Sequence, residues 1–106
     1  MSRAFVVVLT TVPNQLQAHR LTQLLLKKRL VACVNLMGPV RSFFWWQGKV
    51  DRAREYLLLI KTRTAQFSQL QKMIEKNHPY SVPEIIALPI LKGNKPYLDW
   101  LRESVR

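Results

Sequence analysis

Three reactive side chains lie within seven residues of this chain, in the segment His78-Pro79-Tyr80-Ser81-Val82-Pro83-Glu84. An imidazole can bind a metal ion or exchange a proton near neutral pH, a phenol can donate a hydrogen bond, and a carboxylate can accept one. Each proline fixes its own φ angle and disfavours a helical residue before it, so the segment is predicted to be a rigid loop. The alternative is purely structural: the loop ends a helix and begins a strand, with Tyr80 packed and Glu84 solvated.

No further motif indicates catalysis. The sequence has no glycine-rich phosphate-binding loop and no pair of carboxylates at an informative spacing. His78 and Glu84 have the chemistry of a base and its orienting group, but the sequence reveals neither a nucleophile nor a substrate pocket beside them. We therefore expect a protein that is not an enzyme.

The composition indicates one basic domain. A chain of 106 residues fits a single domain, residues 1–106, and a hydrophobic content of 48% is sufficient for its core. Its 17 Lys and Arg residues exceed its 6 Asp and Glu residues, which gives a net charge of +11. Because the basic residues are dispersed, we expect weak nonspecific attraction to nucleic acid and no specific nucleic-acid partner.

The single cysteine, Cys33, bears on both compartment and chemistry. It cannot form an internal disulfide, and its apolar neighbours predict burial in the core of a protein in a reducing compartment. As a thiolate it would instead be a candidate Cu(I) ligand. No stretch has the ~20 apolar residues of a membrane helix, and Met1–Thr11 lacks the features of a signal peptide. We expect a cytoplasmic protein without a membrane partner, with residues 1–106 as its mature chain.

Hydrophobic periodicity predicts the order βαββαβ followed by a helix. The predicted segments are a strand over Ala4–Leu9, a helix from Asn14 to Arg29, a strand over Leu30–Leu36 that resumes over Val40–Trp46 after a bend at Met37–Pro39, a strand over Lys49–Thr62, a helix capped by Thr64 and ending near Asn77, an edge strand over Glu84–Leu91 and a helix from Pro96 to Val105. Gln47-Gly48 is a strong turn signal and joins the second and third strands into one long hairpin. The predicted fold is an α+β, ferredoxin-like sandwich, in which two helices cover one face of a four-stranded antiparallel sheet.

The hairpin carries more aromatic surface than such a sheet can bury. Phe43-Phe44-Trp45-Trp46 directs large rings to both sides of one strand, although helices cover only one side. Contacts between subunits would bury the rest, so we expect an oligomer. The alternative is that the C-terminal helix, with Tyr97 and Trp100, covers this surface within one chain.

Five separated segments resemble the CutA divalent-cation-tolerance family, in the same order and over nearly the whole chain. They are Leu30–Asn35, Ser42 with Trp46–Lys49, Glu55 with Ile60–Thr62, His78–Tyr80 with Pro83–Ile86, and Tyr97–Trp100. The resemblance implies a ferredoxin-like fold assembled as a homotrimer and a role in the tolerance of copper and other divalent cations. It also implies an architecture similar to that of the trimeric PII signalling proteins, which bind small effectors in clefts between subunits.

The resemblance implies a metal site that this chain has only in part. Some bacterial members carry a cysteine where this chain has Thr10 and a second histidine where it has Asn77. His78 remains as the principal candidate ligand for Cu2+ or another divalent cation, and Cys33 is the second. Tight copper and zinc sites need three or four nitrogen or sulfur ligands, so a weak site is predicted.

The alternative function is a PII-like small-molecule sensor or scaffold. Lys61, Tyr80 and Glu84, together with His78, would suit a polar cleft at a subunit boundary, in which the lysine holds an anionic effector. An ion pair between Lys61 and Glu55 on the same predicted strand is the structural alternative.

Overall fold

The computed structural model describes residues 4–106, so the first three residues of the Met1–Thr11 segment lie outside the described part. The elements are β1 (Phe5–Val12), α1 (Gln15–Lys27), β2 (Cys33–Trp46), β3 (Lys49–Arg63), the 3-10 turn η1 (Thr64–Gln66), α2 (Phe67–Asn77), β4 (Ile86–Pro89) and α3 (Lys95–Ser104). This order confirms the predicted sequence of strands and helices. None of the described helices has the length and hydropathy of a membrane span.

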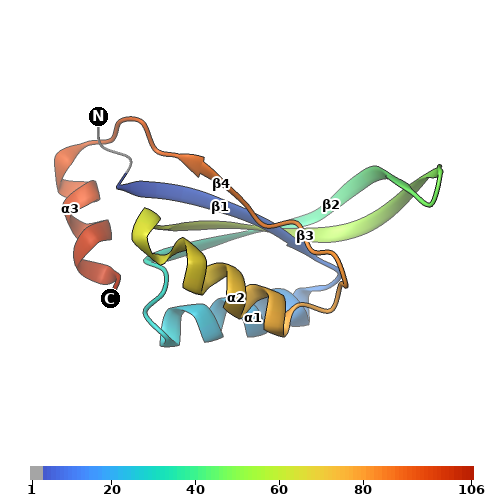
Figure 1. The fold of residues 1–106 in the computed structure, drawn as a ribbon, viewed down its shortest axis with the longest axis horizontal. Helices are drawn as coiled ribbons and strands as arrows, with labels where there is room; N and C mark the ends of the chain where they lie inside the picture. The colour runs from blue at the N-terminus through green and yellow to red at the C-terminus, as the bar shows by residue number, and fades with distance from the viewer. Residues whose placement is uncertain (1–3) are drawn as a thin grey trace.

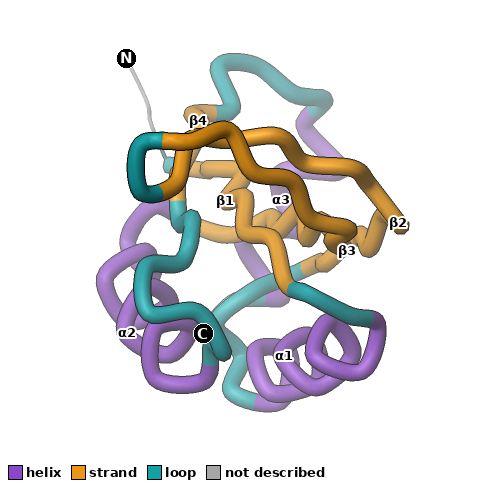
Figure 2. Tube along the Cα trace, turned by 90° about the vertical axis from the view of Figure 1, so that its right-hand side faces the viewer, coloured by secondary structure: helices purple, strands orange, loops and turns teal. Residues whose placement is uncertain are grey.

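The four strands form one antiparallel sheet in the order β2-β3-β1-β4. Helices α1 and α2 lie side by side against one face of this sheet, as Figures 1 and 2 show from two directions. This two-layer α+β arrangement confirms the predicted sandwich. The short strand β4 lies at the edge next to β1, which agrees with the proline at its end.

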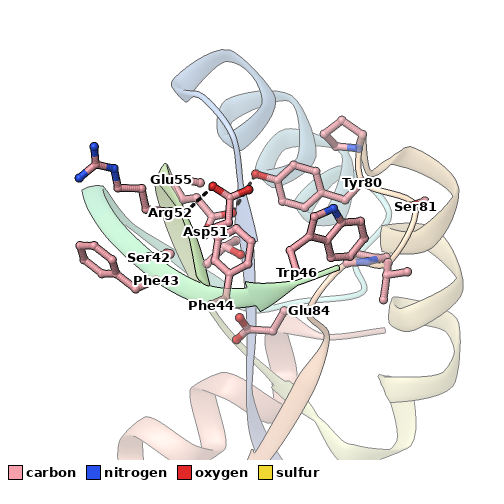
Figure 3. Close-up of a pocket in the computed structure, with 15 residues that line it drawn as sticks. Ser42, Phe43, Phe44, Trp46, Asp51, Arg52, Glu55, Tyr80, Ser81 and Glu84 are labelled. Carbon is pink, nitrogen blue, oxygen red and sulfur yellow. Dashed lines mark hydrogen bonds between the residues drawn. The ribbon is translucent and has the colours of Figure 1, made fainter. Parts of the chain in front are cut away.

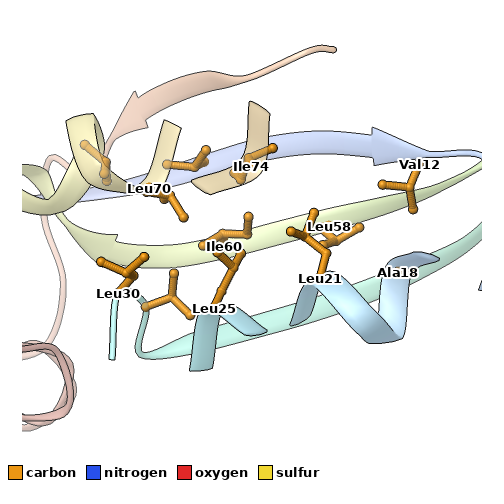
Figure 4. Packing of buried hydrophobic residues seen from close by; sticks show 12 residues of the cluster. Val12, Ala18, Leu21, Leu25, Leu30, Leu58, Ile60, Leu70 and Ile74 are labelled. Atoms are coloured by element: carbon orange, nitrogen blue, oxygen red, sulfur yellow. The ribbon is translucent and has the colours of Figure 1, made fainter. Parts of the chain in front are cut away.

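The core lies between the sheet and the two helices. Alternate residues of the central strands, such as Val8 on β1 and Ile60 on β3, are fully buried on the helix side. Leu25 of α1 and Leu70 of α2 belong to the same cluster of buried side chains (Figure 4). Each such side chain contributes roughly 1.5–3 kcal/mol through the apolar surface it removes from water. The opposite face of the sheet has no comparable cover.

Local signals place most element boundaries. The side chain of Asn14 accepts a hydrogen bond of 2.9 Å from the backbone N–H of Gln17, which confirms the predicted cap of α1. The prediction for Thr64 differs in detail, because this residue begins the turn η1 and α2 begins at Phe67. Strand β1 extends three residues beyond the predicted Leu9, since β3 is long enough to pair with it as far as Val12.

The hairpin of β2 and β3 projects well beyond the rest of the sheet (Figure 1). Gln47 and Gly48 both have positive φ angles, 52° and 78°, as a type I′ hairpin turn requires, which confirms the predicted turn. The predicted bend appears as a shift of strand register between Met37 and Val40. At this bend a Cβ on Gly38 would collide with the ring of Tyr56, so only glycine fits there.

Helix α3 covers only one end of the open face. Its Leu101 and Val105 pack against Phe5, while the aromatic segment of the hairpin remains exposed, with Trp45 at 75%. The alternative in which the C-terminal helix buries this segment is therefore wrong. The open face also exposes Leu88 of β4, at 50%. Burial of these side chains by another subunit stays a prediction.

Candidate functional site

The imidazole of His78 is held by hydrogen bonds at both ring nitrogens. Its Nε2 lies 2.7 Å from the backbone oxygen of Thr11 at the end of β1, and its Nδ1 lies 3.1 Å from the backbone nitrogen of Tyr80. A carbonyl only accepts and a backbone N–H only donates, so Nε2 carries the proton and Nδ1 accepts. The ring is thus neutral, and it ties the loop after α2 to the sheet.

Burial lowers the pKa of His78 below its ordinary value of 6.5, because desolvation disfavours the charged imidazolium. The hydrogen bond to Thr11 and the nearby carboxylate of Glu55 act in the opposite direction but are smaller. The histidine is therefore predominantly neutral at pH 7. A metal ion that binds its ring must displace one of the two hydrogen bonds.

Tyr80 reaches back to the middle of the hairpin. Its phenol donates a hydrogen bond of 2.8 Å to Oε2 of Glu55, a carboxylate on β3 that is only 6% exposed. Burial, with smaller contributions from the bond to Glu55 and the charge of that carboxylate, raises the pKa of Tyr80 to about 12. The phenol consequently remains a hydrogen-bond donor throughout the neutral range.

A cavity of about 830 Å³ lies between this loop and the distal half of the hairpin (Figure 3). Its lining comes from the end of β1, from facing parts of β2 and β3, and from the loop itself. The lining residues are Thr11, Ser42, Phe43, Phe44, Trp46, Asp51, Arg52, Ala53, Glu55, Pro79, Tyr80, Ser81, Val82, Pro83 and Glu84. The size falls within the range of small-molecule sites in proteins, roughly 300–1,000 Å³.

The structure brings two of the four side chains expected in a cleft to this cavity. Tyr80 and Glu84 line it, whereas Lys61 and His78 do not. Lys61 lies at the other end of β3, where its Nζ is 5.9 Å from the centre of the Tyr97 ring. The alternative ion pair between Lys61 and Glu55 is also wrong, because the two residues are six positions apart on one strand, which separates them by roughly 20 Å.

The second candidate metal ligand, Cys33, lies far from His78 along the sheet. It begins β2 opposite Lys61 and is half-buried rather than part of the core, with its Sγ 3.7 Å from Oδ1 of Asn35. Its register explains this exposure, because Cys33 pairs with Lys61 on the face away from the helices, whereas Val34 pairs with Ile60 of the core. Within residues 4–106, no three His, Cys, Asp or Glu side chains converge in a way that could hold a metal ion.

Thr10 and Asn77, the two positions at which some family members carry soft ligands, both have side chains that do not act with His78 in this structure. Thr10 is fully buried, and its hydroxyl has no hydrogen-bond partner among residues 4–106. The Asn77 amide donates 2.8 Å to the backbone oxygen of Met73 and closes the end of α2. Neither side chain supplements His78 as a ligand.

Several lining residues were not predicted from the sequence. Ser42, Phe44 and Trp46 alternate along β2 and so share one face, and Asp51 and Glu55 do the same on β3. This alternation was visible in the sequence. The missing signal was the path of the loop, which decides that this face borders a cavity.

Three comparisons place the chain among known proteins. Residues 6–104 match the model of the CutA1 divalent ion tolerance protein family. A divalent-cation tolerance protein CutA from Thermus thermophilus is 49% identical over 92% of this chain and 95% of its own length. The chloroplastic CutA 1 of Oryza sativa is 46% identical over 95% of this chain, which spans 57% of that longer protein.

Solved structures agree in fold. That of the divalent cation tolerance protein from Thermus thermophilus superimposes with a TM-score of 0.94 at 47% identity, over 96% of this chain and 99% of that one. The structure of a periplasmic divalent cation tolerance protein CutA from Archaeoglobus fulgidus superimposes with a TM-score of 0.93 at 39% identity, over 96% and 99% of the two chains.

Proposed function

Because the chain belongs to the CutA1 family of divalent ion tolerance proteins, we propose that it acts in the cellular response to divalent cations, copper among them, as a homotrimer. The proposed role is one of binding rather than catalysis. The family match over residues 6–104 is the observation that carries this proposal. We propose a cytoplasmic location on the grounds of the single unpaired cysteine.

The proposed interaction with a divalent cation is weak. His78 offers one imidazole whose two nitrogens are already hydrogen-bonded, and Cys33 offers one half-buried thiol at the other end of the sheet. Binding at either place would replace existing hydrogen bonds or use solvent to complete the coordination sphere. An affinity well below that of three- or four-ligand sites follows.

Calorimetric titration of the purified protein with Cu2+ and with Zn2+ tests this role. Saturable binding that weakens in His78→Gln supports His78 as the ligand, and a further loss in Cys33→Ser supports the thiol. Asn77→Ala is the matched control, since its amide already bonds to Met73. Absence of saturable binding, or binding unchanged in all variants, would refute direct cation binding by these side chains.

The proposed trimer is supported by the apolar surface that one chain leaves open. Leu88 on β4 and the aromatic segment of the hairpin are exposed, and contacts between subunits would bury both. Sedimentation velocity on Leu88→Asp, compared with Leu16→Asp, tests this. Leu16 is the control because it is at least as exposed as Leu88, at 58% against 50%, but lies on α1. Only Leu88→Asp should shift the protein toward the monomer; a wild-type monomer at micromolar concentration would refute the trimer.

A second function is favoured by the cavity beside the His78 loop. A volume of about 830 Å³ with aromatic walls and a few polar groups fits a small molecule better than a single metal ion. We propose that the protein is a PII-like sensor or scaffold that binds such an effector. The loop that bounds the cavity is hydrogen-bonded to Thr11 at the end of β1 through His78, and to Glu55 of the hairpin through Tyr80. A change in the loop when an effector binds would therefore reach the hairpin.

A further inference from the structure

Acidic residues are concentrated at the cavity of a strongly basic chain. Three of the six acidic residues, Asp51, Glu55 and Glu84, line it, against one of the 17 basic residues, Arg52. Figure 3 shows the guanidinium of Arg52 directed away from Tyr80 and Trp46. The cavity is thus a local region of negative charge on a protein whose net charge is +11.

Glu55 lies at the centre of this region and lacks a cation. It is only 6% exposed, and its one hydrogen bond within residues 4–106 joins Oε2 to the phenol of Tyr80. The other oxygen, Oε1, has no partner there, and the one ion pair of the described chain is Lys95–Asp99 on α3. Because Glu55 lines the cavity, this free carboxylate oxygen can accept a charge-assisted hydrogen bond from a cation that enters the cavity.

The remaining walls suit the body of such a cation. The rings of Phe44, Trp46 and Tyr80 line the cavity and provide apolar surface as well as electron-rich faces that attract positive charge. A bare divalent metal ion would find no group of three ligands there among the described residues. An organic cation would use both the carboxylate and the rings.

We propose that this cavity binds a small organic cation, a primary amine carried on an aromatic or aliphatic body. The ammonium group donates to the free Oε1 of Glu55, and the body lies among the rings. This inference rests on the proposed small-molecule role of the cavity and specifies the class of effector. It replaces the expectation of an anionic effector, because Lys61, the cation that was to hold it, lies outside the cavity.

Three small molecules of similar shape but different charge test whether the cavity selects its ligand by charge or only by size. Phenethylamine, 2-phenylethanol and phenylacetate are titrated calorimetrically into the full-length protein at pH 7. We expect saturable binding of the amine, at least about tenfold weaker binding of the alcohol, and none of the carboxylate, since charged hydrogen bonds are the stronger ones. Equal affinity for all three, or preference for phenylacetate, overturns the inference but leaves the small-molecule role intact. Binding of none refutes both.

Two substitutions test whether the amine binds at Glu55. Glu55→Gln keeps the size of the side chain and should weaken phenethylamine binding at least about tenfold. Glu103→Gln makes the same change of net charge on the exposed surface of α3 and should have no effect. Equal losses in the two variants would show that only the overall charge matters and overturn the inference.

Two further measurements keep the test decisive. If Glu55→Gln does not fold, the double variant Asp51→Asn, Glu84→Gln changes two exposed cavity carboxylates and should weaken amine binding by a smaller factor. In the competing explanation, a basic side chain of a second copy of the chain pairs with Glu55. Sedimentation of Glu55→Gln tests this, because loss of such a pair would weaken the oligomer. Dissociation of the oligomer without any amine binding to the wild type overturns the inference.

Discussion

The phenol of Tyr80 donates a 2.8 Å hydrogen bond to the buried carboxylate of Glu55, across 25 residues of sequence. This bond joins the loop after α2 to the middle of β3 and closes one wall of the cavity (Figure 3). Together with burial, which has the larger effect, this bond raises the pKa of the phenol and so favours retention of its proton.

Removal of this hydrogen bond should destabilise the protein. In Tyr80→Phe the carboxylate of Glu55 loses its only partner within the described chain, and we expect a loss of about 1.5–3 kcal/mol in the free energy of unfolding. Guanidinium chloride unfolding at fixed protein concentration measures it. Tyr97→Phe, at the surface, is the control and should change stability by less than ~0.5 kcal/mol. Equal effects of both substitutions would contradict the assigned bond.

The raised pKa of Tyr80 predicts a loss of stability at alkaline pH. An unfolded tyrosine releases its proton near pH 10.0, whereas folded Tyr80 holds it until about pH 12. Between these values the folded state binds more protons, so its free energy of unfolding falls as pH rises. Absorbance at 295 nm should show one late-ionising tyrosine, absent from Tyr80→Phe. If Tyr80→Phe left the titration curve unchanged, the raised pKa of Tyr80 would be contradicted.

The lowered pKa of His78 predicts the opposite dependence at acid pH. The unfolded imidazole takes up a proton near pH 6.5, but the folded ring resists it through burial. A protonated ring would also direct its Nδ1 proton at the N–H of Tyr80. The free energy of unfolding should therefore fall as pH drops below 6.5, and His78→Gln should lessen this dependence. Unfolding measured between pH 5 and 7 tests the difference; identical slopes would refute it.

Gly38 should not tolerate a side chain. A Cβ at this position meets the ring of Tyr56, so Gly38→Ala must displace the ring or the bulge, at a cost of about 1–3 kcal/mol. The double variant Gly38→Ala, Tyr56→Leu should recover part of the loss, because the smaller side chain leaves room. Thermal unfolding measures both. Stability of Gly38→Ala equal to that of the wild type would contradict the contact.

Local sequence signals were sufficient for the order of elements. The apolar alternation of β3, the Gln47-Gly48 turn and the cap at Asn14 each involve residues close in sequence, and each has a local physical cause. The rigidity of the His78–Glu84 loop was predicted in the same way from its prolines. The exact ends of the strands could not be predicted in this way, because β1 continues only as far as β3 can pair with it.

The sequence by itself determined which groups were available: one imidazole, one phenol and one carboxylate on a stiff loop, in a basic chain with few acids. Only the tertiary structure decided their chemistry. The path of the loop sets both ring nitrogens of His78 against backbone groups and Tyr80 against Glu55, while the length of β3 carries Lys61 to the far end of the sheet. Those contacts join segments 25 and 67 residues apart, and no local periodicity encodes such distances.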